Sequence, residues 1–251
     1  LEARKVAGLY GAGQFNGSSG YEEAAVQGFA AGVNAALKIL GRPPFVLKRS
    51  EAYIGALIDD LVTRGTNEPY RMMTSRSEYR LLLRQDNADE RLTRIGYELG
   101  LVSKERIAAV EAKYAAVSAE LERLERTHVA PTPELGAALE ALGTAAPVSG
   151  VSLAALLRRP QVGYDDLAPF DADRPPLPRA VTQQVEIRLR YEGYIKRQLR
   201  QVEEFAHMES RALPADIDYE KVPGLRTEAR QKLAALRPES FGRASRISGV
   251  S

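Results

Sequence analysis

Helical periodicity constrains this chain more than any other feature of its sequence. Residues 103–126 form the most regular stretch, because apolar side chains recur there at alternating intervals of three and four. The seam consists of Ile107, Val110, Tyr114, Val117, Leu121 and Leu124. A second long helix is expected over residues 181–208, as the antiparallel partner of the first. Its stripe consists of Tyr191, Ile195, Leu199 and Val202.

Shorter elements are expected around this helix pair. Helix formers, caps and glycine stops predict helices over 21–40, 50–64, 76–85 and 89–99. Residues 131–178 are rich in Pro, Gly and Ala, which predicts an irregular connection holding short helical pieces. Only residues 5–10 have the pattern of a strand, and a glycine cluster and a helix follow them. The predicted fold is therefore mainly α, with a strand-turn-helix start and a small helical tail.

Composition excludes several classes of protein. The 251 residues contain no cysteine and two histidines, which argues against a disulfide scaffold, a thiol nucleophile and a metal site. No apolar run reaches the ~18–20 residues of a membrane-spanning helix. The chain begins with Leu1 and an abrupt stretch of structured sequence, so we expect it to be part of something larger.

The net charge of +2 is too small to indicate a nucleic-acid-binding protein, but it is unevenly distributed. Residues 188–200 carry a local +4, with Tyr191 and Tyr194 interleaved, and residues 221–246 carry +5. Basic surface with aromatic neighbours is compatible with RNA or DNA, whereas the plain alternative is a solvated helix. The candidate residues are Arg188, Arg190, Lys196, Arg197, Arg200, Arg243 and Arg246.

The glycine cluster at residues 11–20 has two interpretations. Glycines before a helix allow backbone N–H groups to approach a phosphate, but the spacing departs from G-x-G-x-x-G and no acidic residue follows at the required distance. A tight turn with close packing is the alternative. Gln14, Asn16, Ser18 and Ser19 favour a polar ligand, such as a polyol or an amide-like ring edge.

Four arginines form the second candidate site. Arg76, Arg80 and Arg84 are spaced i, i+4, i+8, so on a helix they would form one guanidinium stripe suited to phosphate. Arg71 lies before them in a loop. The alternative is a solvated face with salt bridges to the acidic residues Glu78, Asp86, Asp89 and Glu90.

The remaining motifs are weaker. Residues 222–225 and 247–250 each place a glycine between apolar residues beside a helix, as both DNA-binding helix-hairpin-helix units and ordinary helix turns do. No catalytic constellation emerges, because adjacent pairs such as Glu22 and Glu23 point about 100° apart on a helix. In the first turn of a helix, Glu22 and Glu23 are expected to interact with the macrodipole.

Four strings closely resemble the MnmG/GidA family of FAD-dependent enzymes that modify the wobble uridine of tRNA. They are AGQFNGSSGYEEAAVQG (12–28), EPYRMMTSRSEYRLLLRQDNADERLT (68–93), VEIRLRYEGYIKRQ (185–198) and GRASRISGVS (242–251). The resemblance covers the C-terminal part of that family's chain. It implies FAD, NADH and methylenetetrahydrofolate as cofactors, a partner GTPase of the MnmE type, tRNA as substrate, a homodimer, a cytoplasmic location and no membrane.

The resemblance also implies site residues and domains. Gln14 would contact FAD, with Gly13, Asn16, Gly17, Gly20 and Tyr21 as neighbours. Arg71 and Arg80 would meet phosphate of tRNA or cofactor. The expected parts are 1–42, the end of a Rossmann-like FAD domain; 43–102, an Arg-rich helical segment; 103–212, the long helices; and 213–251, a basic tail.

Three hypotheses about the function therefore remain open. The leading one is the C-terminal part of a flavoenzyme; it is expected to be inactive alone, since the family's phosphate loop, nicotinamide region and catalytic cysteines lie upstream. The second is a non-catalytic helical adaptor that binds a protein through the 107–124 and 191–202 seams. The third is a DNA-binding module built on the two tail glycine turns.

Overall fold

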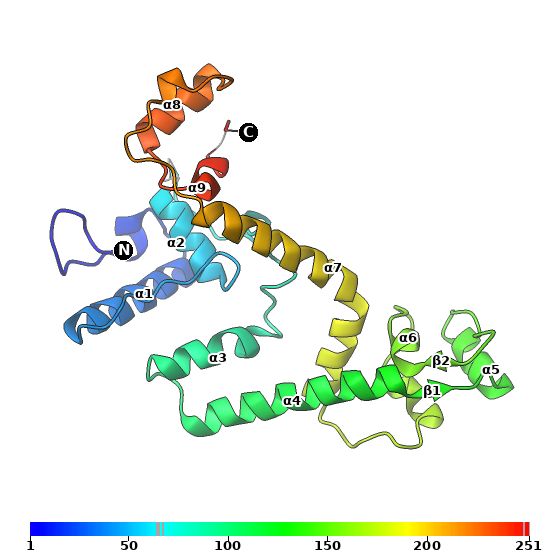
Figure 1. Cartoon of the computed structure of the whole chain (residues 1–251). Coiled ribbons are helices and arrows are strands. Elements are labelled where there is room, and N and C mark those ends of the chain that lie inside the picture. Colours follow the sequence, from blue (N-terminus) through cyan, green and yellow to red (C-terminus); the bar gives the residue numbers. More distant parts are fainter. Residues whose placement is uncertain (64–65, 67, 248, 251) are drawn as a thin grey trace. The chain divides into compact units, whose positions relative to one another are not determined.

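The computed structural model describes residues 1–63, 66, 68–247 and 249–250, and it divides into two compact units. The split unit joins Leu1–Leu83 to Arg197–Ser251, and the middle unit is Arg84–Lys196. Figure 1 shows that helices dominate both units. The mainly α prediction is confirmed. The four-part division of the chain is not tested by these units and stays a prediction.

The split unit begins with a turn, where a strand was expected. Residues 5–10 fold back on themselves, with the Ala3 N–H donating to the Leu9 carbonyl at 2.8 Å and an isolated bridge between Glu2 and Tyr10. The strand prediction is wrong, because an apolar run forms a strand only where a neighbouring strand is available to pair with it. The elements that follow in the N-terminal part of this unit are η1 (Gly13–Asn16), α1 (Tyr21–Ile39), α2 (Tyr53–Thr63) and η2 (Thr74–Arg76).

The helix expected over 76–85 is also absent. After η2 the backbone is extended at Ser77 and then turns, while Tyr79 and Leu83 are buried. The helix expected over 50–64 is present as α2, whose predicted end at Arg64 and Gly65 lies outside the described residues. The C-terminal part of the unit holds the end of α7 (Arg179–Ser210), η4 (Tyr219–Lys221), α8 (Thr227–Leu236) and α9 (Phe241–Ser245).

A small core closes the C-terminal tail. Tyr219, Leu233 and Ala244 are buried together, with Leu213 and Ile217 packed against them. Gly224 and Gly249 both have positive φ, as the two predicted turns require, whereas Ser248 lies outside the described residues. Contact with DNA at these turns stays a prediction.

The middle unit is built on a helical hairpin. α4 (Lys104–Arg126) runs back along α3 (Ala88–Glu98), so an antiparallel pair is present, but its members are α3 and α4 (Figure 1). The seam of α4 is buried or half-buried, as predicted. The stripe predicted on the second long helix is wrong at Tyr191 and Leu199, which are exposed, whereas Ile195 and Val202 are half-buried. α7 instead buries Val181, Val185 and Leu189.

The short helical pieces expected within residues 131–178 are present, but the segment is more than a connection. The predicted irregular connection supplies most of the core of the middle unit, with Leu139, Leu153 and Leu157 fully or almost fully buried. Side-chain oxygens cap two of its helices at Thr132 and Ser152, and a two-stranded antiparallel sheet pairs His128 with Ser152. The elements of this segment are α5 (Pro133–Ala141), β2 (Val151–Ser152), α6 (Leu153–Leu157) and η3 (Asp165–Phe170), and β2 pairs with β1 (His128–Val129), which lies just before it.

Candidate functional site

The glycine turn, residues 11–20, leads directly into α1. Gly17 closes η1 in the left-handed conformation, with φ at 73°, which a residue with a side chain adopts only under strain. Gln14 is exposed to solvent in this turn, as are two aromatic residues, Phe15 at 94% and Tyr21 at 92%. No side chain caps the N-terminus of α1 at Gly20. Exposed rings and an exposed amide therefore occur next to the N-terminal end of a helix.

Hydrogen bonds with buried polar groups hold the glycine turn in place. The Gly13 N–H donates to Oε1 of the fully buried Gln27 at 2.9 Å. The Tyr70 N–H donates to the Gly17 carbonyl at 2.7 Å, and the buried Ser18 hydroxyl donates to the Tyr70 carbonyl at 3.3 Å. These contacts place the glycine turn beside residues 68–80, which we name the arginine loop. Two site candidates that are fifty residues apart in the sequence are thus neighbours.

Arg49 is the centre of the network that holds the arginine loop. Its side chain is 8% exposed and contacts Asp59 at 3.1 Å, Asp60 at 2.7 Å and Glu78 at 2.9 Å. Asp60 also accepts a hydrogen bond from the Tyr70 hydroxyl at 2.7 Å. Burial, and then this bond to a carboxylate, raise the pKa of Tyr70 far above its ordinary value. Both ends of the loop are therefore fixed to α2 and to the segment before it.

The C-terminal part of α7 also contacts this loop within the split unit. The buried Tyr79 ring packs edge-on against Phe205, with centroids 6.3 Å apart. Gln198 donates to the Glu78 carbonyl at 3.0 Å. Arg197 and Arg200, two of the predicted surface residues, therefore lie on the helix that packs against the arginine loop.

The four arginines of the second candidate site do not form a helical stripe. Arg71 is 55% exposed and pairs through Nε with Glu23 at 3.3 Å. Arg76 lies over the Tyr70 ring, 4.7 Å from its centroid, and Arg80 is exposed and forms no ion pair with the residues that the structure describes. Arg84 belongs to the middle unit, where it pairs with Asp86 at 3.1 Å. The stripe prediction is wrong because no helix forms there, although three of the arginines share one loop.

Some of the basic residues near the C-terminus form salt bridges within the chain, and others do not. Arg188 pairs with Glu90, Arg190 with Glu186 at 3.3 Å, and Lys196 with Glu192 at 2.5 Å. Arg243 pairs with Glu239 at 2.7 Å. The Arg246 side chain is only 10% exposed and lies between Glu209 and Asp59, which gives it a structural part in the split unit. Arg197 and Arg200 are exposed, and neither pairs with a described residue.

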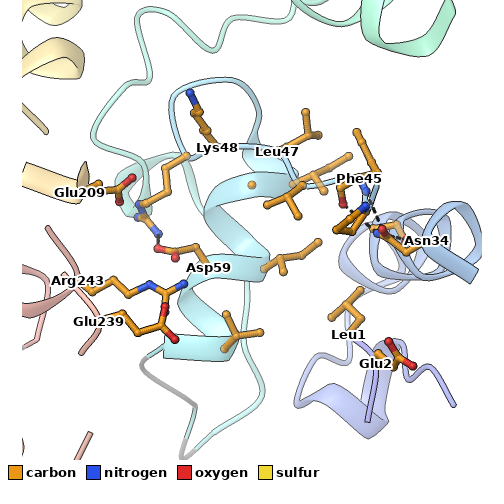
Figure 2. A pocket seen from close by; sticks show the side chains of 18 of the residues that line it. Leu1, Glu2, Asn34, Phe45, Leu47, Lys48, Asp59, Glu209, Glu239 and Arg243 are labelled. Carbon is orange, nitrogen blue, oxygen red and sulfur yellow. Dashed lines mark hydrogen bonds and ion pairs between the residues drawn. The ribbon is translucent and has the colours of Figure 1, made fainter. Parts of the chain in front are cut away.

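A cavity of about 780 Å³ lies in the split unit and was missed by the sequence analysis. Its apolar lining residues include Phe45, Ile54 and Ile58. Figure 2 shows Glu209, Glu239 and Arg243 on one side and Leu1, Glu2 and Asn34 on the other. Among the predicted site residues, it includes Arg243 and Arg246 alone.

Two features are not found in the described part of the chain. No group of three or more His, Cys, Asp or Glu residues could hold a metal ion there. No helix of that part combines the length and the apolar content that crossing a bilayer requires.

Three family models match successive parts of the chain. Residues 1–43 match the model described as glucose inhibited division protein A, residues 104–199 match the MnmG/GidA C-terminal helical domain, and residues 201–251 match the MnmG/GidA C-terminal helical bundle. The chain belongs to the MnmG/GidA family. The glycine turn lies within the first match, whereas the arginine loop lies between the first and the second.

Individual MnmG/GidA proteins match along the whole chain. The tRNA uridine 5-carboxymethylaminomethyl modification enzyme MnmG of Lachnoclostridium phytofermentans is 57% identical over 251 residues, and that of Bacillus subtilis is 53% identical. Both matches cover 100% of this chain and 40% of the relative. A form II crystal structure of Aquifex aeolicus GidA superposes with a TM-score of 0.81 at 42% identity, covering 100% of this chain and 39% of that one. The chain thus spans about 40% of the length of these curated relatives.

The MnmG/GidA match does not identify the residues that build the site. Arg49, Gln27 and the burial of Glu23 were missed by the sequence analysis. The one available signal was that Glu23 and Gln27 are four residues apart and so share a face of α1. A buried arginine within residues 43–52 carries no comparable pattern.

Proposed function

We propose that this chain is the C-terminal part of an FAD-dependent tRNA-modifying enzyme. With a partner GTPase, that enzyme would add an aminomethyl or carboxymethylaminomethyl group to C5 of the wobble uridine. This part would complete the FAD site at the glycine turn and bind tRNA and the GTPase. The observation that carries the proposal is the hydrogen bond between Tyr70 and Gly17, because it joins a turn suited to a polar ligand to a loop of exposed arginines.

The residues of the glycine turn fit a flavin nucleotide. Gly13 and Gly17 keep the turn tight, Gln14 and Asn16 supply amide groups, and Tyr21 exposes its ring at the open end of α1. An exposed ring favours a planar group. Nε2 of Gln27 is buried and has no hydrogen-bond partner among the residues that the structure describes. FAD would supply the redox chemistry.

The arginine loop fits phosphate. Arg71, Arg76 and Arg80 project from a backbone anchored at Tyr70 and Glu78, so their guanidinium groups are presented from a fixed frame. Guanidinium binds phosphate oxygens bidentately and stays charged at neutral pH. Arg197 and Arg200 extend the cationic surface along α7. The proposal has two versions: in one the arginine loop binds phosphate of tRNA, and in the other it binds phosphate of FAD.

The other family properties are part of the proposal for the complete enzyme. They are NADH and methylenetetrahydrofolate as co-substrates, a homodimer and a cytoplasmic location. The adaptor alternative loses one of its two surfaces, since the 107–124 seam is covered by the packing of the middle unit.

Binding of tRNA by the chain tests the proposal. Its affinity is expected to fall with salt, log K changing by about −0.9 per phosphate neutralised on duplex regions for each unit of log salt. Arg80→Ala should weaken binding and reduce that slope, and Arg126→Ala, an equal loss of charge on the exposed end of α4, should not. Titration of the same variants with FAD shows whether Arg80 binds phosphate of tRNA or of FAD. Absence of tRNA affinity at low salt, or equal losses for the two variants, would contradict the proposal.

In the complete enzyme, Arg71→Ala and Arg80→Ala are expected to reduce uridine modification while the protein remains folded. Activity equal to that of the unaltered enzyme would remove these two residues from the site.

A further inference from the structure

Buried polar side chains on α1 contact the glycine turn and the arginine loop. Glu22 and Glu23 are adjacent in the first turn of this helix, yet Glu22 is exposed and Glu23 is 4% exposed. Gln27, one turn further along, is fully buried. Burying a carboxylate is costly unless it is paired and hydrogen-bonded, so the partners of Glu23 indicate what it does there.

Glu23 holds the arginine loop by its backbone and by a side chain. Its Oε1 accepts the Met72 N–H at 2.8 Å and lies 3.3 Å from Nε of Arg71. The Met72 N–H bond, more than any other contact, lowers the pKa of Glu23, so the group is ionised at neutral pH. The contact uses the inner nitrogen of the guanidinium, and the Arg71 side chain stays more than half exposed.

The same carboxylate lies against the glycine turn. A Cβ at Gly20 would come within 1.8 Å of Oε2 of Glu23 and within 3.0 Å of Cζ of Arg71, so a side chain there would displace the Glu23 carboxylate. Gln27 holds the other end of the turn through the Gly13 N–H. The buried polar side chains on α1 therefore contact both the glycine turn and the arginine loop.

We propose that Glu23 is a positioning residue, whose buried carboxylate sets Arg71 and the arginine loop at a fixed place relative to the glycine turn. The inference rests on the proposed function, in which Arg71 meets a phosphate group. It explains why an acidic side chain occupies the interior of a cationic site. It also makes a prediction opposite to that of simple charge attraction.

The test compares two variants with the same change of charge. Glu23→Gln and Glu22→Gln each raise the net charge by one, which by itself favours tRNA. If Glu23 positions Arg71, Glu23→Gln weakens tRNA binding by about fivefold, as expected for loss of one charge-assisted contact. Glu22→Gln should leave the affinity unchanged or slightly higher. In an Arg71→Ala background, Glu23→Gln should have a smaller effect, because only the contact with the Met72 N–H is then lost.

Two outcomes would overturn the inference while leaving the proposed function in place. One is tRNA binding by Glu23→Gln that equals binding by Glu22→Gln. The other is an equal loss from Glu23→Gln with and without Arg71, which would show a purely structural part for Glu23. Failure of the unaltered chain to bind tRNA would instead contradict the proposed function.

A second measurement tests the position of Arg71 without using tRNA. In NMR spectra of the chain, the Met72 amide and the Arg71 Nε–H should exchange slowly with solvent, and the Nε–H should exchange faster in Glu23→Gln. Equal Nε–H exchange in both proteins would overturn the inference. If Glu23→Gln does not fold, Glu23→Asp, which keeps the charge on a shorter side chain, takes its place in both experiments, and Glu22→Asp is then its matched control.

Discussion

In the middle unit, apolar side chains from α4, α5, α6 and α7 meet in one buried cluster that includes Leu139, Leu156 and Val185. In the split unit, the arginine loop is held by the buried ions Arg49, Asp60 and Glu23. Apolar packing is tolerant of direction, whereas hydrogen-bonded ions fix distances and angles. The region proposed to act on a ligand is thus the one held by directional contacts, and its weak points differ from those of the apolar cluster.

Loss of Arg49 should be the most damaging single change. Arg49→Met leaves Asp59, Asp60 and Glu78 without their shared guanidinium, and breaking a buried ion network costs about 4 kcal/mol of unfolding free energy. Denaturant unfolding, with hydrogen exchange read separately in each unit, should place the loss in the split unit. Lys48→Ala, at the exposed neighbouring position, should change stability by less than about 0.5 kcal/mol. A loss spread equally over both units would show that they unfold together.

Truncation in the apolar cluster should have the next largest effect. Leu156 is fully buried on α6, and Leu156→Ala should cost about 3 kcal/mol through lost burial and the cavity left behind. Hydrogen exchange should accelerate in the middle unit, and tRNA affinity should change little at temperatures where that unit stays folded. Val148→Ala, at a position 99% exposed, is the matched control. A Leu156→Ala variant as stable as this control would show that the cluster is loosely packed.

The pH dependence of stability should be smaller, and it should depend on Glu23. Because the folded-state pKa of Glu23 is lowered, its contribution is present above the ordinary value of 4.5 and is lost as pH falls through the lowered value. Unfolding measured between neutral and acidic pH should therefore show a decline that is shallower in Glu23→Gln. Identical profiles for that variant and Glu22→Gln would contradict the bond to Met72.

The smallest predicted effect lies in the tail of the split unit, away from the arginine loop. Arg237 ends α8 with φ at 41°, a left-handed conformation that favours glycine. Arg237→Gly should raise the stability of the tail by about 0.5 kcal/mol, because relief of strain exceeds the loss of an exposed bond to the Ala215 carbonyl. Thermal unfolding measures the change. Decreased stability would show that the bond to Ala215 outweighs the strain.

Periodicity was sufficient to predict the long helices but not their partners. The seam of α4 was found because residues three and four apart share a helix face whatever covers it. The seam is covered by α3 and by the apolar cluster of α5, α6 and the start of α7, and not by the predicted stripe of α7. Tyr191 and Leu199 of that stripe are exposed, because burial depends on which segments pack nearby. Residues 131–178 gave no periodic signal because α5 and α6 have nine and five residues, too few to display one.

The candidate site was predicted in its parts and not in its assembly. The strings around Gln14 and Arg71 marked both segments, and the family match agrees with the resemblance they carry. The arginine stripe failed because local spacing assumed a helix that the buried Tyr79 and Leu83 do not form.

Local sequence was enough to establish the helical character of this chain, its family and the two polar segments proposed to meet a ligand. Only the tertiary structure separated Glu22 from Glu23, made Arg49 a buried centre and set Tyr70 against Gly17. The physical reason is that propensity and periodicity act within a few residues, whereas burial of an ion is decided by groups that lie far apart in the chain and meet only on folding.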